Sequence, residues 1–297
     1  MRAPLLVVLS GLLLSSVAEA QQSHPLVTAA PGAQRDPVPP NDSIIVKGAP
    51  LPTESEVRSL ARAITPKVSF LDPLDRFQDS VCFGSVGLDR PVLEEIGDRL
   101  AQSAERAGLK LAGPGCKPNI VILFVDRVDA EIARLIRRRW WVFGNRSPSQ
   151  IDMIVKERGP VRAWSNIEVK NADGESIDAG GILRRTTASN IMSATRRDVI
   201  ASIVLVQRSA LFGKTVRQIG DYLAMRTLAG VRPERATGKD TILALFNEGV
   251  TSSPSEMTAF DRGYLKGLYS AQANQVASSM RATIVQTIFK EQHRAAK

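Results

Sequence analysis

The apolar residues that follow Thr53 recur at helical spacing in several separate segments. Thr53 and Glu56 form the pattern of a capping box, which predicts a helix that ends near Ile64. Asp89 and Gly108 bracket a second amphipathic segment. Further helices are expected at 129–142, 148–158 and 215–229, followed by C-terminal helices within 257–291.

Two other patterns predict strands. Residues 119–126 (NIVILFVD) form a continuous apolar run between polar residues, which is typical of a buried central strand. Residues 162–170 alternate, as expected of a half-buried strand. Additional strands are expected at 80–87, 182–187 and 199–206. This order predicts an α+β fold, with a mixed five-stranded sheet, packed helices and a helical C-terminal part.

The N-terminus has the pattern of a secretory signal. Arg2 precedes the apolar stretch 5–14, and cleavage is expected after Ala20 in the sequence Ala-Glu-Ala. Residues 21–52 are rich in proline and predict a flexible tether, so that 53–297 forms a single domain. We therefore expect a secreted or periplasmic protein without a transmembrane span.

The composition limits the chemistry that the chain can carry. It holds 39 Lys plus Arg against 30 Asp plus Glu, a formal net charge of +9, but only two histidines and two cysteines. Multi-cysteine zinc modules and iron–sulfur clusters are thereby excluded. In an oxidising compartment Cys82 and Cys116 are expected to form a structural disulfide that closes a loop of about 34 residues. The alternative is a redox or nucleophilic thiol, which the absence of Cys-x-x-Cys disfavours.

Over roughly residues 80–270 the order of strands and helices resembles that of the zincin metallopeptidases, and of metzincins in particular. Residues 258–269 match the pattern Thr-x-x-Asp-x-x-x-Leu-x-x-Leu-Tyr of zincin-like C-terminal helices, and 241–247 (TILALFN) resemble the Met-turn region. The resemblance implies that 215–230 is the active-site helix and that 129–158 is a helical insertion. The chain also looks like uncharacterised secreted proteins of Gram-negative bacteria.

The resemblance fails at the metal site. Zincins carry His-Glu-x-x-His, in which two imidazoles bind zinc and the glutamate acts as general base. The corresponding residues are Leu223, Ala224, Met225, Arg226 and Thr227, and Asp221 is the only carboxylate of that helix. The two histidines, at positions 24 and 293, lie in the tether and the C-terminal tail. We therefore expect a degenerate zincin that holds no metal and needs no cofactor.

A basic and aromatic segment follows the central strand. Ile132, Ile136, Trp140 and Phe143 are expected to share the core face of one helix. Another face would present a candidate anion-binding surface, to which the pairs Arg184-Arg185 and Arg196-Arg197 add positive charge. The candidate residues are Arg134, Arg137, Arg138, Trp141, Arg184 and Arg185. The alternative is a solvated helix face, paired with acidic residues elsewhere.

These observations favour an exported, non-catalytic binding domain that contacts an anionic envelope component or a protein partner. The alternative is a hydrolase, peptidase-like or glycosidase-like, that uses carboxylates in the ancestral groove. A third hypothesis is strand addition through 41–48, a β-prone island that resembles the short N-terminal motif of TonB-dependent receptors. Nucleic acid is not expected as a partner, because no binding motif is recognisable.

Overall fold

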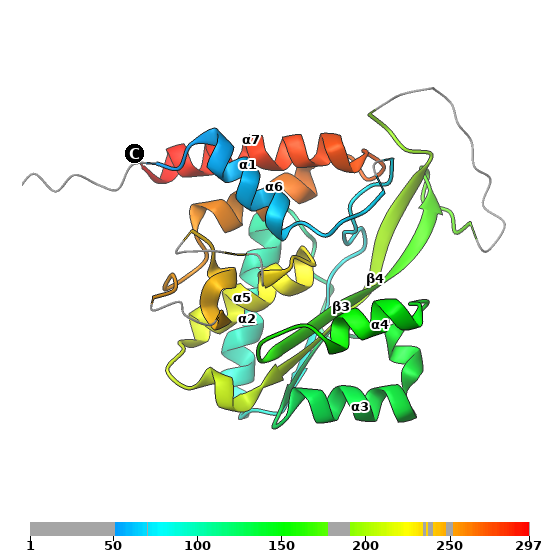
Figure 1. The fold of residues 1–297 in the computed structure, drawn as a ribbon, viewed down its shortest axis with the longest axis vertical. Helices are drawn as coiled ribbons and strands as arrows, with labels where there is room; N and C mark the ends of the chain where they lie inside the picture. The colour runs from blue at the N-terminus through cyan, green and yellow to red at the C-terminus, as the bar shows by residue number, and fades with distance from the viewer. Residues whose placement is uncertain are drawn as a thin grey trace, which may run out of the picture. The chain divides into compact units, whose positions relative to one another are not determined.

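The computed structural model describes residues 51–69, 71–177, 191–233, 236, 240–247 and 252–296 (Figure 1). The predicted signal, the predicted tether up to residue 50 and the predicted strand at 182–187 lie outside them. Within this range the chain is α+β, as predicted. The helices are α1 (Glu54–Ile64), α2 (Arg90–Ala107), α3 (Val128–Arg138), α4 (Pro148–Val155), α5 (Val216–Leu228), α6 (Ala259–Ser270) and α7 (Ala277–Ala295). The strands are β1 (Phe83–Val86), β2 (Ile120–Val125), β3 (Val161–Asn171) and β4 (Thr195–Gln207).

The sheet is mixed and open, with the strand order β1-β2-β4-β3. β1, β2 and β4 run parallel, while β3 pairs antiparallel with β4 and forms an edge. The prediction of five strands is wrong for the described residues, which form four in this sheet. Four of the five predicted strands are present. β4 begins four residues earlier than predicted, because residues 195–198 pair with the last residues of β3.

The two faces of the sheet are covered by different helices. Ile120, Ile122 and Phe124 of β2 face the main core, where α2 packs against α5. Leu205 of β4 faces a smaller core beneath the segment from α3 to α4. Figure 1 shows α3 and α4 beside the β3–β4 pair, with α1, α6 and α7 grouped away from them. The predicted helical insertion therefore forms a layer of its own.

Capping residues define the helix ends much as the sequence predicts. Thr53 and Glu56 form a reciprocal capping box at α1, and Thr258 and Asp261 form one at α6. Gly108 ends α2 in a left-handed conformation, φ 93°. A residue with a β-carbon rarely adopts that conformation, so the glycine makes the sharp stop possible.

The predicted disulfide between Cys82 and Cys116 is present, with the two α-carbons 6.2 Å apart. Cys82 immediately precedes β1, and Cys116 lies in the loop that leads into β2. The bridge thus closes the loop containing α2, and the loop-entropy model assigns it roughly 3–4 kcal/mol.

Candidate functional site

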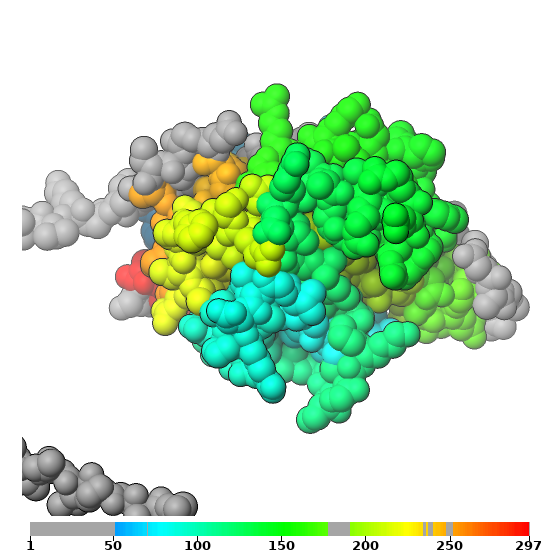
Figure 2. Space-filling view, turned by 90° about the horizontal axis from the view of Figure 1, so that it is seen from below, coloured from blue at the N-terminus to red at the C-terminus, as the bar shows by residue number. Residues whose placement is uncertain are grey.

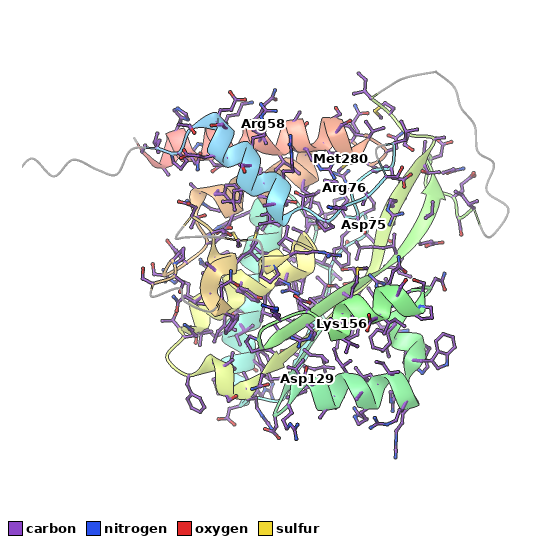
Figure 3. The ribbon with its side chains drawn as sticks, in the orientation of Figure 1. Arg58, Asp75, Arg76, Asp129, Lys156 and Met280 are labelled. Atoms are coloured by element: carbon purple, nitrogen blue, oxygen red, sulfur yellow. A yellow bond between two sulfur atoms is a disulfide. The ribbon has the colours of Figure 1, made fainter. Side chains whose placement is uncertain are left out.

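A groove of about 600 Å³ lies where the edge of the sheet meets the C-terminal end of α5. Its walls come from β3, the final turn of α5, α4 and the segment that follows α1. Asp75, labelled in Figure 3 beside β4, contributes to the same groove. This volume lies in the range of known small-molecule sites.

Arg226 reaches this groove from α5, in the stretch that aligns with His-Glu-x-x-His. Its side chain is 3% exposed, and its Nη2 lies 2.6 Å from Oε1 of Glu157, just beyond α4. Its Nη1 donates to the hydroxyl of Tyr222 at 3.1 Å. Burial alone would lower the pKa of Arg226, but the Tyr222 oxygen and the Glu157 carboxylate outweigh it and raise the pKa. A permanent cation, paired with one carboxylate, therefore lies where the resemblance would place zinc.

The other residues of that stretch serve packing. Leu223, Ala224 and Thr227 are buried, and the Thr227 hydroxyl donates to the Leu223 carbonyl at 2.8 Å. Of these three, only Thr227 lines the groove. The helix is buried on all sides from Ile219 to Leu228, which is wider than the single apolar stripe that the sequence indicates.

Asp221 is fully buried and points away from the groove. Its two carboxylate oxygens accept from Nε and Nη2 of Arg99 on α2, at 2.6 and 2.8 Å. One of them also accepts from the backbone N–H of Met257 at 2.5 Å. The only carboxylate of α5 thus connects α5 to α2 and to the chain that enters α6.

Two half-buried arginines face the groove with different partners. Arg197 of β4 is paired with Asp75 at 2.5 Å, and this pairing outweighs burial and raises the pKa of Arg197. Arg146, between η1 (Trp140–Phe143) and α4, donates to the carbonyl of Ser165 at 2.6 Å. No described carboxylate lies within ion-pair distance of Arg146, and burial lowers its pKa despite the nearby Asp75. Arg146 is therefore a groove cation without an ion pair among the described residues, as are the exposed Lys67 and Arg232, which also line the groove.

Three carboxylates line the groove, and each has a cationic partner. Asp75 pairs with Arg197, Glu157 with Arg226, and Glu168 with Lys170 at 3.4 Å. A hydrogen bond from Ser176, the largest cause, and the proximity of Lys170 lower the pKa of Glu168. A catalytic acid needs the opposite shift, toward a protonated carboxyl at neutral pH.

Potential metal ligands do not cluster in the described ranges. No three Asp, Glu, Cys or His side chains there come together as a metal-binding group. His293 lies on α7, where its Nδ1 is 2.8 Å from the carbonyl of Phe289. None of the helices in the described part of the chain is long and apolar enough to cross a membrane.

The basic segment at the end of α3 differs from its prediction in one respect. Arg134, Arg137, Arg138 and Trp141 are exposed, as a contact surface requires. However, Ile136 and Trp140 are exposed too, by 38% and 67%, so the predicted core face is wrong for these two, whereas Ile132 and Phe143 are buried as predicted. The last two candidates, Arg184 and Arg185, lie outside the described residues.

The inward-facing residues of this segment are Val128, Ile132 and Leu135, with Phe143 on the following 3₁₀ helix. The helix ends at Arg138, and Arg139 adopts φ −145° and ψ 42°, which is not helical. Because this break rotates the chain, spacing counted from Ile132 no longer predicts which face Trp140 shares.

Sequence reasoning missed Arg146 and Glu157, and it used Arg197 only as part of the basic pair Arg196-Arg197. None of the three lies in a motif that predicts a groove. They meet only because the insertion folds back on β3 and brings residues far apart in the chain to one groove. The one available signal was Arg226 itself, since a charged residue inside a buried helix requires a partner.

Comparisons with protein-family models, with curated proteins and with solved structures give no match to this chain.

Proposed function

We propose that this chain is an exported, non-catalytic binding domain, built on a zincin-like scaffold that lacks the zinc ligands. Its basic surface would contact an anionic component of the cell envelope. Its groove would hold a ligand that carries a negative charge.

The order of elements supports the scaffold. α5 follows the last strand of the sheet, and its C-terminal end lines the groove beside the antiparallel edge strand β3. The 3₁₀ helix η4 (Ile242–Phe246) then packs against α5, as the resemblance to the Met-turn region implies. Asp261 joins this turn to α6, because its carboxylate accepts from the Ile242 N–H and the Thr258 N–H, both at 2.9 Å.

The ion pair between Arg226 and Glu157 is the observation that carries the proposal. A zincin groove performs chemistry through a cation that polarises a carbonyl and activates water. Here the cation is a guanidinium, which has neither an open coordination position nor an exchangeable water. The groove remains open beside it, so the scaffold retains room for a ligand after losing the means of hydrolysis.

The charge around the groove indicates the class of ligand. The three carboxylates are paired, whereas Arg146 has only backbone carbonyls as hydrogen-bond partners among the described residues. Hydrogen bonds to a charged partner contribute about 1.5–3 kcal/mol each. A carboxylate or phosphate group near Arg146 would therefore bind more favourably than a neutral or basic one.

The test uses the purified mature protein and two fluorescein-labelled peptides, one of Ala and Glu and one of Ala and Lys. We expect fluorescence polarisation to detect binding of the acidic peptide only. Arg146→Gln should weaken it about tenfold or more, because one charge-assisted contact is lost. The matched control Arg106→Gln removes an exposed cation of α2 and should leave the affinity unchanged.

Two results would contradict the proposal. Equal binding of both peptides, or none, would rule out an anion-selective groove. Stoichiometric zinc together with peptide cleavage would show an active metallopeptidase. Cleavage without metal that is lost in Glu168→Gln would instead support the hydrolase hypothesis. The observation that favours that alternative is the presence of three carboxylates in one groove.

A further inference from the structure

Six consecutive exposed residues end α3 and begin η1. We name this segment, 136–141, the Arg–Trp tip. Its apolar members Ile136, Trp140 and Trp141 are 38%, 67% and 62% exposed. α3 ends at Arg138 and Arg139 is not helical, so the six exposed residues span the change of direction from α3 to η1. The tip therefore projects from the domain, and Figure 2 shows α3, in green, at the surface on the side viewed from below.

The exposure of the two tryptophans is built into the fold. Immediately after them, Phe143 is fully buried and stacks on Trp164, with ring centroids 4.9 Å apart. The carbonyl of Val142 accepts from the indole N–H of Trp164 at 3.0 Å and from the Asn166 amide at 3.1 Å. The backbone that carries Trp140 and Trp141 is thus held against β3, so their rings are kept out of the core.

The positive charge of the tip is not neutralised within the described part of the chain. Arg134, one turn earlier, donates to Glu131 at 2.9 Å. Arg137, Arg138 and Arg139 are exposed and make no ion pair or side-chain hydrogen bond with a described residue. Two exposed indoles thus lie beside three unpaired guanidinium groups.

We propose that the Arg–Trp tip inserts into the interface of an anionic phospholipid bilayer. This inference rests on the proposed function, because it names the anionic envelope component as the lipid surface. Tryptophan favours the region between headgroups and acyl chains, where its ring is buried and its N–H can still find an acceptor. Basic residues close to the surface add electrostatic attraction to acidic headgroups.

The shape of the tip favours a bilayer over a protein or a glycan. No tip residue lines the groove described above, so the rings are presented outward rather than into a recess. A projecting pair of rings requires a surface that can open around it, and a lipid interface does so without a preformed pocket.

Flotation with vesicles measures the binding. One set contains phosphatidylglycerol and phosphatidylcholine in equal parts, and the other contains phosphatidylcholine alone. We expect the mature protein to float with the anionic vesicles and to be released by high salt. Neutralising the tip in R137Q/R138Q/R139Q should lower the partition coefficient in the range of 100-fold, because each arginine contributes about fivefold.

The matched control is R106Q/K110Q/K117Q, which removes the same net charge from exposed positions in α2 and in the loop before β2. It should weaken binding only a few-fold, because these residues lie outside the tip. Both triple variants change exposed side chains, so thermal melting should confirm that they remain folded.

Insertion is tested by fluorescence with brominated phosphatidylcholine in the anionic vesicles. We expect quenching in the natural chain. The W140F/W141F variant keeps only the buried Trp164, and its fluorescence should be unaffected. If the natural chain floats but is not quenched, or if the tip and control variants bind equally, the tip does not insert and the proposal is wrong.

Failure of this inference and failure of the proposed function can be distinguished. If the acidic peptide binds the groove but the natural chain does not bind vesicles, the lipid proposal is wrong and the proposed function stands. If the chain binds soluble heparin through the same arginines but not vesicles, the tip recognises an acidic glycan and the lipid proposal is overturned. If the chain binds vesicles but the groove is catalytic, the proposed function is wrong and the tip is the membrane contact of an enzyme.

Discussion

At the scale of single residues, buried charges determine what the groove can do. Arg226 and Asp221 are both buried in α5, five residues apart on the helix. Asp221 is neutralised by Arg99 and joins helices, whereas Arg226 is neutralised by Glu157 and lines the groove. Removing one member of a buried pair leaves an uncompensated charge, which costs more than the pair contributes.

This asymmetry predicts the response to Glu157→Gln. We expect a loss of about 3–5 kcal/mol in the free energy of unfolding, because Arg226 would remain buried without its carboxylate. The double variant Glu157→Leu/Arg226→Met should lose far less, because both charges are gone. Urea unfolding followed by circular dichroism measures both values.

The control is Asp152→Asn on α4, which breaks the exposed pair with Lys156. It should change stability by at most about 0.5 kcal/mol, because an exposed pair contributes little. A Glu157→Gln variant as stable as this control would show that Arg226 is not held by Glu157.

At the scale of elements, α6 and α7 approach closely because two glycines lie between them. A β-carbon placed at Gly267 would lie 2.6 Å from the α-carbon of Ile284, and one at Gly263 would lie 2.4 Å from that of Ile288. Real β-carbons essentially never approach backbone atoms so closely. The sequence pattern of α6 therefore reflects a packing requirement as well as helix formation.

Gly267→Ala should destabilise the protein by about 1–3 kcal/mol, because α7 must move away from α6. Gly97→Ala on α2 is the matched control, since a β-carbon there meets nothing within 4 Å. It should stabilise the protein by about 0.5–1 kcal/mol, through the helix propensity of alanine. Thermal melting of both variants checks the opposite signs, and a stabilised Gly267→Ala would contradict the close approach.

Much of this element structure could be predicted from the sequence. Thr53, Thr215 and Thr258 each begin a helix through a capping box, and Gly108 ends one. These signals succeed because capping is a local interaction, complete within four or five residues. The prediction for Trp140 failed because α3 ends at Arg138, and helical spacing does not extend through the non-helical Arg139.

At the scale of the whole molecule, the disulfide is consistent with the compartment that the sequence predicts. The disulfide is expected only where the environment is oxidising, and the sequence predicts export through the signal that ends at Ala20. The predictions of a five-stranded sheet and of an anion-binding site depended instead on which segments of the chain come together in the fold. The sheet has four strands in the described chain, and two of the six anion-site candidates, Arg184 and Arg185, lie outside it.

We expect the protein recovered from the periplasm or the medium of an expressing cell to begin at Gln21 and to contain the disulfide. Intact-mass measurement before and after reduction checks both, through the missing signal and the two hydrogens gained on reduction. A variant that lacks residues 2–20 should stay in the cytoplasm with free thiols. Full-length chain with its signal intact and free thiols in the natural protein would contradict the prediction of export.

The sequence by itself determined the features that depend on neighbouring residues or on composition: the capped helices, the central apolar strand and the cysteine pair. Only the tertiary structure decided which charges share the groove and which aromatic rings face outward. Arg197 and Arg226 lie on β4 and α5, whereas Arg146 and Glu157 lie in the loops on either side of α4, so their meeting depends on how the insertion packs on β3. The physical reason is range: a capping bond or a hydrophobic period is local, whereas an ion pair across a groove depends on every element between its partners.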